Sequence, residues 1–203
     1  MVEGRRITNA ETLKIVTMVY AGYINKTIVA HLQHFGSNAI GICGADSNAI
    51  TAHKRVKGDV DYGFAGDIDA VNSTFLRQLL HQGNDIIMAP ITHDKNGQLL
   101  NTNADTIAQE IAVAMSADFE VSLIYSFEKA GVLMDANDDS TVITTIDANS
   151  YQQLKSENVI FAGMIPKLDN AFTAIGRGVR KVIIGNAESL DNLVSGKKGT
   201  TII

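Results

Sequence analysis

Three short polar side chains alternate along the stretch LLNTNADTIAQE, where an apolar helical pattern begins. These are Asn101, Asn103 and Asp105, which are two residues apart from one another. Two carboxamides and a carboxylate can hold the carboxylate or phosphate group of a ligand and can orient a lysine or a metal ion. A plainer interpretation is that Asn103 caps the helix and Asp105 complements its dipole, each worth about 1 kcal/mol or less. Taken alone, the stretch favours this structural interpretation, which leaves Asn101 unexplained.

Two basic residues also occupy positions that suit a bound anion. Lys167 lies in the first turn of the helix predicted after GMI, with Pro166 near the first helical position. A cation there opposes the helix dipole, and an anion bound at the same helix end would explain its presence. Arg6, beside Arg5 and before the first predicted helix, has the side chain that grips a carboxylate with two hydrogen bonds. Each residue is equally ordinary as a solvated surface cation.

The sequence lacks the motifs of several other common kinds of active site. The stretch GKKGT at 196–200 lacks the spacing of a P-loop, and Gly58, Gly63 and Gly66 do not form a dinucleotide fingerprint. The five histidines follow no metal-binding pattern, and there is no G-x-S-x-G elbow of a serine hydrolase. Cys43 is the only cysteine, so an internal disulfide is excluded, and its apolar neighbours predict a core residue.

Length, charge and hydropathy narrow the class of protein further. With 203 residues and 45% hydrophobic content, the chain can form one large domain or two closely packed lobes. The net charge of −5 and the scattered basic residues argue against a nucleic-acid partner. No apolar run approaches the roughly 20 residues that cross a bilayer, and the polar start MVEGRR is unlike a signal peptide. We therefore expect no membrane partner and a cytoplasmic location.

The elements that would position these residues alternate between strands and helices. A long helix is expected from about Asn9 towards His34, with Thr8 and Glu11 as a capping box and Gly36 at its end. Strands are expected at 39–43, 85–91, 120–127, 181–184 and 200–203, a hairpin at 50–71, and helices at 73–81, 104–117, 150–157, 166–176 and 188–194. This alternation favours a mainly parallel sheet with helices on both faces, and it places 101–105 in a loop at the carboxyl edge, where ligands bind.

Several motifs in order resemble one family, the acetylglutamate kinases of the amino acid kinase superfamily. They are EGRRIT, GICGAD, DYGFAGD, APITHD, LLNTNAD, GVLMD, GMIPK and the final GTTI, which together span essentially the whole chain. The resemblance implies an α/β fold, a three-layer αβα sandwich with a mainly parallel central sheet, as a single amino acid kinase domain over 1–203. Residues 1–118 would form the acylglutamate-binding and dimerisation lobe, and 119–203 the ATP-binding lobe.

The same resemblance implies a reaction and roles for single residues. ATP would phosphorylate the side-chain carboxylate of N-acetyl-L-glutamate or a related N-acylglutamate, the second step of arginine biosynthesis, with Mg²⁺ carried by the nucleotide and no metal ligand on the protein. Arg6 and Asn101 would hold the substrate, and Asn103 would line the same site. The catalytic residues would be Asp105, which organises lysines, and Lys167, which stabilises the transferring phosphoryl group. The nucleotide is expected against Phe127, Glu128, Lys129, Gly131, Phe161 and Gly163.

Two departures from the family pattern bear on activity. The chain has Phe127-Glu128 where a Ser-Asp pair is common, and it contains neither the K-x-G-G nor the H-G-G-G segment that would cradle phosphates. We therefore expect an N-terminally truncated kinase of weak or no activity. The alternative is a catalytically impaired fragment or a non-catalytic acylglutamate-binding or regulatory protein. A relative acting on carbamate, aspartate or a nucleotide is a third interpretation, and a homodimer through the 9–34 helix is expected in any case.

Overall fold

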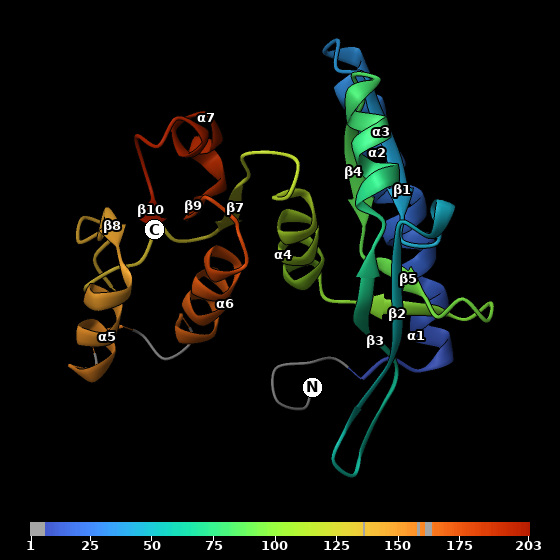
Figure 1. Ribbon diagram of the computed structural model, residues 1–203, viewed down its shortest axis with the longest axis horizontal. Helices are drawn as coiled ribbons and strands as arrows, with labels where there is room; N and C mark the ends of the chain where they lie inside the picture. Colours follow the sequence, from blue (N-terminus) through green and yellow to red (C-terminus); the bar gives the residue numbers. More distant parts are fainter. Residues whose placement is uncertain (1–6, 136, 158, 161–163) are drawn as a thin grey trace. The chain divides into compact units, whose positions relative to one another are not determined.

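The computed structural model describes residues 7–203 except 136, 158 and 161–163 (Figure 1). The chain forms two compact units, residues 1–114 and 115–203, which divide at the end of helix α4 (Ala104–Met115). The division expected from the sequence lay at 118/119, and the ligands assigned to the two lobes stay predictions. Within the described part of the chain, no helix is both long and apolar enough to cross a membrane.

Unit 1 begins with one helical run in three parts. These are α1 (Ala10–Val16), the π-helix η1 (Thr17–Ile24) and α2 (Asn25–His34), and the run ends before Gly36, which has a φ of 85°. The predicted long helix is therefore confirmed, but its predicted cap is wrong. Oδ1 of Asn9, not the Thr8 hydroxyl, accepts a hydrogen bond from the Thr12 amide at 2.8 Å. Asn9 takes the cap because Thr8 is fully buried and contacts another part of unit 1.

A two-stranded parallel sheet follows, formed by β1 (Ala39–Cys43) and β4 (Asp85–Ala89). Helices α2 and α3 (Ser73–His81) contact these strands (Figure 1). The buried Asn25 fixes α2 on the sheet by donating a hydrogen bond from Nδ2 to the Ile87 carbonyl at 2.8 Å. Gly41 allows this approach, because a Cβ there would lie 2.0 Å from Oδ1 of Asn25.

The remaining strands of unit 1 close into a barrel of β2 (Ile50–Lys57), β3 (Val60–Val71), β6 (Leu99–Thr102) and β5 (Ile91–His93). The predicted hairpin at 50–71 is confirmed as β2 and β3. The single strand predicted at 85–91 is wrong, because it is interrupted at Pro90, which has no N–H to donate to a ladder. The short helix η2 (Asp46–Asn48) leads into β2.

Unit 2 is built around β9 (Lys181–Asn186), whose middle residues 182–185 are all buried. Consecutive buried positions mean that both faces of the strand are covered, and α6 (Ile165–Gly176) and α7 (Leu190–Val194) both contact it (Figure 1). The sheet order is β7 (Ser122–Phe127), β9, β10 (Thr200–Ile202) and β8 (Thr145–Ile146), with only β9 and β10 antiparallel. Helix α5 (Ala148–Ser156) and the short helix η3 (Ala187–Ser189) complete the unit.

Candidate active site

Asn101 lies in strand β6 and not in the loop that the sequence predicts. It pairs with Ala65 of β3 on one side and with Ile91 of β5 on the other. Its neighbour Thr102 is buried and its hydroxyl lies 2.7 Å from that of Thr92. Because side chains alternate along a strand, Asn101 points to the opposite face of the barrel wall. A carboxamide held in a paired strand is more rigidly placed than one in a loop.

The buried Thr8 orients the Asn101 side chain. Nδ2 of Asn101 donates a hydrogen bond to Oγ1 of Thr8 at 3.1 Å, which leaves the carboxamide oxygen and the second amide hydrogen for a ligand. Thr8 is fixed in turn by β3, since its amide donates to the Tyr62 carbonyl and its carbonyl accepts from the Phe64 amide. Gly63, with a φ of 64°, permits this pairing because a Cβ there would lie 2.3 Å from the Thr8 carbonyl oxygen.

Asn103 and Asp105 lie at the start of α4. Oδ1 of Asn103 accepts a hydrogen bond from the Thr106 amide at 2.9 Å, so its predicted role as a helix cap is confirmed. Only the amide end of the Asn103 side chain is then left to line a binding site. Asp105 is exposed in the first turn of α4, where a carboxylate complements the helix dipole.

Lys167 lies in unit 2, in the first turn of α6. Pro166 precedes it, as expected for a helix start, and Lys167 is half-buried. Its Nζ atom lies 5.8 Å from the ring centroid of Tyr125, over the ring. The cation therefore lies over an aromatic side chain of β7, at the start of a helix that would also attract an anion.

The residues expected around the nucleotide follow the carboxyl end of β7. The Glu128 carbonyl accepts a hydrogen bond from Nδ2 of Asn186, at the end of the neighbouring β9, at 3.1 Å. Nζ of Lys129 lies 3.8 Å from Oδ1 of Asp139. Gly131 is buried, and a Cβ there would lie 2.7 Å from Oγ1 of Thr200. Packing alone therefore requires a glycine at 131.

Three of the predicted site residues lie outside the described residues. They are Arg6 in the N-terminal segment and Phe161 and Gly163 before α6. For Phe127 the structure gives the backbone position, as the last residue of β7. The substrate and nucleotide contacts predicted for these four residues stay predictions.

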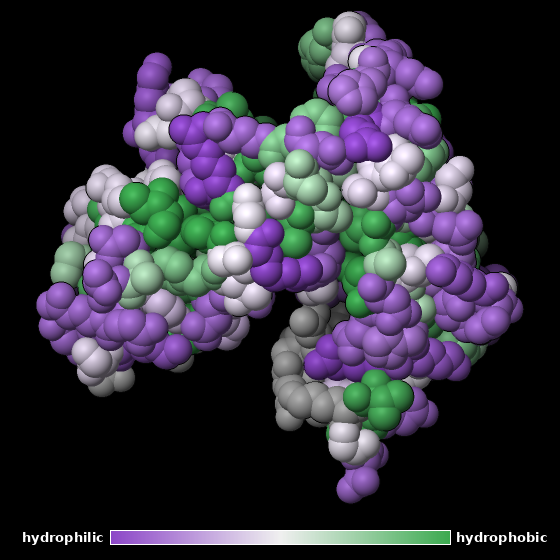
Figure 2. Space-filling view, in the orientation of Figure 1, coloured by the Kyte–Doolittle hydropathy of each residue, from purple (hydrophilic) through white to green (hydrophobic). Residues whose placement is uncertain are grey.

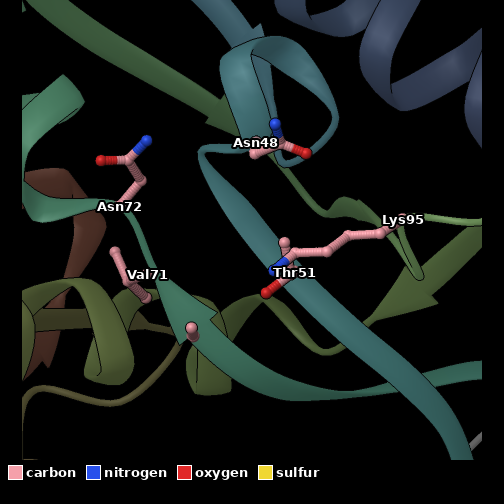
Figure 3. A pocket seen from close by; sticks show the side chains of 6 residues that line it. Asn48, Thr51, Val71, Asn72 and Lys95 are labelled. Atoms are coloured by element: carbon pink, nitrogen blue, oxygen red, sulfur yellow. The ribbon is translucent and has the colours of Figure 1, made fainter.

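Two cavities lie among the described residues of the separate units. One of about 560 Å³ in unit 1 is lined by Asn48, Thr51, Ala70, Val71, Asn72 and Lys95, and the Lys95 side chain extends towards Thr51 (Figure 3). It lies at the far end of β3 from Asn101, about 16 Å along the strand. The other, of about 220 Å³ in unit 2, is lined by Ala130, Asn186, Glu188, Leu193 and Lys198. This second cavity adjoins the residues predicted to meet the nucleotide.

Two observations concern metal and thiol chemistry. Among residues 7–203, apart from the gaps in the description, no group of three or more His, Cys, Asp and Glu side chains is placed to hold a metal ion. Burial, which outweighs the other influences, raises the pKa of the Cys43 thiol above its ordinary value. A thiol with a raised pKa is a poor nucleophile at neutral pH, as expected for Cys43. Cys43 is half-buried, however, so its predicted position in the core is not confirmed.

Comparison with known proteins decides the family. The family model described as "Amino acid kinase family" matches residues 2–186. The chain belongs to the amino acid kinase family. It is 55% identical to the acetylglutamate kinase of Cytophaga hutchinsonii, over 100% of this chain and 78% of that protein. It is 56% identical to the acetylglutamate kinase of Bacteroides fragilis, over 94% of this chain and 73% of that protein.

Solved structures share the fold of this chain. The protein smu.665 from Streptococcus mutans UA159 superposes with a TM-score of 0.78 at 28% identity, over 100% of this chain and 76% of that chain. N-acetylglutamate synthase from Neisseria gonorrhoeae gives a TM-score of 0.83 at 24% identity, over 100% of this chain and 46% of that chain. The predicted amino acid kinase fold and the resemblance to acetylglutamate kinases are thus confirmed.

Two side chains that contact residues of the candidate site were missed by sequence reasoning. Thr8 was assigned to a helix cap, although it orients Asn101 from 93 residues away. Tyr125 was treated as an ordinary strand residue, although its ring lies under Lys167. The family motifs LLNTNAD and GMIPK marked Asn101 and Lys167, and EGRRIT includes Thr8, but no local pattern indicated that Thr8 contacts Asn101 or that Tyr125 contacts Lys167.

Proposed function

We propose that this chain transfers the γ-phosphoryl group of ATP to the side-chain carboxylate of N-acetyl-L-glutamate. The product is an acyl phosphate, and the reaction is the second step of arginine biosynthesis. The observation that carries the proposal is the identity of 53–56% to several acetylglutamate kinases over most of this chain. Nothing in these comparisons favours a non-catalytic binding or regulatory protein.

The substrate end of the reaction is assigned to unit 1. The substrate is a dicarboxylate, so the protein must hold one carboxylate while the other reacts. Arg6 supplies the charge for this grip, and Asn101 supplies hydrogen bonds from a side chain that Thr8 already orients. Asn103 contributes through the amide end that helix capping leaves available. An oriented carboxamide loses little freedom on binding, which favours affinity.

The nucleotide end is assigned to unit 2. The attacking carboxylate and the phosphoryl group are both negative, so catalysis depends on positioning and on neutralising charge. Lys167 supplies a positive charge at the start of α6. Asp105, which belongs to unit 1, is assigned the ordering of lysine side chains for the transfer. The segment from Phe127 through Glu128 and Lys129 to Gly131, with Phe161 and Gly163, lines the nucleotide. Mg²⁺ carried on the ATP phosphates would neutralise part of their charge.

We further infer a homodimer and a cytoplasmic location. The dimer inference is supported by large apolar side chains that the first helical run exposes, Ile15, Met18, Val19, Tyr23, Ile24 and Ile28. They follow one another at spacings of one, three or four residues, which keeps most of them on one side of the run. Apolar side chains at such density on one surface mark a protein interface.

The activity is tested by coupled ADP release with ATP, Mg²⁺ and a panel of acceptors. The panel is N-acetyl-L-glutamate, N-succinyl-L-glutamate, L-glutamate, carbamate and aspartate. We expect release with the acylglutamates and not with the other acceptors, at the low rate expected of a chain without the K-x-G-G and H-G-G-G segments. Lys167→Ala should lower this rate by about a hundredfold. Lys181→Ala, at the amino end of β9, is the matched control and should retain activity.

Binding is measured in parallel, because it does not depend on turnover. The melting temperature should rise with N-acetyl-L-glutamate more than with L-glutamate. The absence of both this shift and acylglutamate-dependent ADP release would refute the proposal. Release with the same efficiency for carbamate or aspartate would assign the chain to another activity of the amino acid kinase family.

A further inference from the structure

The cation of Lys167 lies over an aromatic ring that is itself fixed in the core of unit 2. Nζ of Lys167 is 5.8 Å from the centroid of Tyr125, and Tyr125 is only 7% exposed. Tyr125 lies on the central part of β7 and pairs with Ile184 of β9, so its backbone cannot shift independently of the sheet. A cation within about 6 Å of a ring face is attracted by the ring, and more strongly where water is partly excluded.

The helix that carries Lys167 is also fixed on a second side. Oη of Tyr151, on α5, donates a hydrogen bond to Oδ1 of Asp169 at 2.7 Å, and the Tyr151 ring stacks on Phe172 with 5.0 Å between centroids. Nζ of Lys155 lies 3.4 Å from the same Asp169 oxygen. Residues two apart on a helix point about 200° apart, so this contact lies away from Lys167.

The contact between Tyr151 and Asp169 persists over the ordinary pH range. Burial, followed by the hydrogen bond to Asp169, raises the pKa of Tyr151 above its usual value, so the hydroxyl keeps its proton and remains a donor. Tyr151 is the buried residue of α5, and the face of the helix visible in Figure 2 is largely hydrophilic. The first turns of α6 are therefore held by α5 on one side, while Lys167 extends towards β7 on another.

We propose that Tyr125 is a positioning residue for Lys167, holding its ammonium group over the ring near the carboxyl end of β7. The inference rests on the proposed kinase function, in which Lys167 neutralises the transferring phosphoryl group. A lysine side chain has several freely rotating bonds, so an unheld ammonium group is found mostly in water. An aromatic ring restricts the ammonium group without cancelling its charge, as a carboxylate would.

The contact is tested by NMR on protein labelled with ¹³C at the lysine ε position. A methylene group over a ring face is shifted upfield by the ring current, and Lys167→Ala identifies the signal. We expect the shifted signal in the unaltered protein and in Tyr125→Phe, which keeps the ring, and its loss in Tyr125→Leu. Leu123→Val, which trims a buried side chain on the same face of β7, is the control and should leave the signal in place.

The positioning role is tested by steady-state kinetics on the same variants. We expect kcat to fall about three- to thirtyfold in Tyr125→Leu, with KM for N-acetyl-L-glutamate unchanged, and Tyr125→Phe and Leu123→Val to stay within about twofold. An unshifted Lys167 signal, or equal kcat in Tyr125→Leu and Tyr125→Phe, overturns the proposal. A shifted signal in a protein that phosphorylates no acceptor overturns the proposed function, and the positioning role with it, while the contact stands.

Discussion

The hydrogen bond between Asn101 and Thr8 determines how the substrate end of the site is presented. Thr8 is fully buried, so Thr8→Val removes a hydroxyl that Asn101 cannot replace with water without rearranging. We expect this change to cost about 1–3 kcal/mol in the free energy of unfolding and to raise KM for N-acetyl-L-glutamate with little change in kcat. Urea unfolding and steady-state kinetics measure the two effects. Thr8→Ser, which keeps the hydroxyl, should restore KM, and a KM unchanged in Thr8→Val would show that Asn101 is not oriented by Thr8.

Asn103 has a confirmed role as a cap and a predicted role as a substrate ligand, and a single substitution separates them. A serine at 103 caps a helix as well as asparagine does but lacks the amide group. Asn103→Ser should therefore keep the free energy of unfolding within about 0.5 kcal/mol while KM for N-acetyl-L-glutamate rises. Asn103→Ala should lose about 1 kcal/mol of stability in addition. If Asn103→Ser has the KM of the unaltered protein, Asn103 is a cap and nothing more.

Sequence reasoning identified Asn101 and Lys167 as residues of the proposed site, and it missed the two side chains that contact them, Thr8 and Tyr125. Helix capping does not explain Asn101, and Lys167 opposes the dipole of its helix. The family motifs then indicated a binding role for Asn101 and a catalytic role for Lys167. Thr8 and Tyr125 are ordinary residues for their elements, and their contacts depend on how distant segments pack. Spacing along a chain carries no information about such contacts, so only the folded structure reveals them.

At the scale of elements, the turn from β7 towards β8 depends on a glycine for packing. A Cβ at 131 would lie 2.7 Å from Oγ1 of Thr200 and 2.9 Å from Cγ1 of Val142, and the Thr200 hydroxyl already accepts a hydrogen bond from the Val132 amide. Gly131→Ala should therefore lower the free energy of unfolding by about 1–3 kcal/mol. Gly176→Ala, at the end of α6 with nothing within 4 Å, is the control and should be neutral or stabilising by up to about 1 kcal/mol. Equal unfolding midpoints in urea for the two variants would contradict this packing.

Most elements were predictable because their signals are local, and the errors have physical causes. Helix α3 and strand β1 follow the predicted bounds, since apolar spacing and flanking turn residues define them. Strand β6 was not predicted because it has only four residues and contains Asn101 close to Asn103, and asparagines are typical of loops. Strand β8 was not predicted because its two residues are too few to show an alternating pattern. The cap of α1 was misassigned because both Thr8 and Asn9 can cap, and burial of Thr8 against β3 decides between them.

At the scale of the whole molecule, the first helical run exposes large apolar side chains to solvent, as expected of a surface that binds another protein chain. Tyr23 is 75% exposed and Met18 is 57% exposed on η1, with further apolar side chains before and after them. The run contains a π-helix, a form with poorer hydrogen-bond geometry that is retained mostly where function favours it. A second copy of the same run would cover these side chains in a two-fold interface, where each residue contributes twice.

A charge placed on this surface should dissociate the proposed dimer. Tyr23→Lys would remove apolar contact and place a charge from each copy in the interface. We therefore expect the mass in analytical ultracentrifugation to fall from twice 21.8 kDa to 21.8 kDa. Val56→Lys, on the β2–β3 hairpin, replaces a residue that is 82% exposed and should leave the mass unchanged. A single-chain mass for the unaltered protein, or no change in Tyr23→Lys, would refute the proposed interface.

The measurement that tests the central claim most directly is ADP release with ATP and Mg²⁺, compared between N-acetyl-L-glutamate and L-glutamate, in the unaltered chain and in Lys167→Ala. The two acceptors differ only in the acyl group, and the variant removes only the proposed phosphoryl-stabilising cation. The account predicts release that requires the acyl group and falls about a hundredfold in Lys167→Ala. Release that is independent of the acyl group, or that Lys167→Ala leaves unchanged, would contradict it.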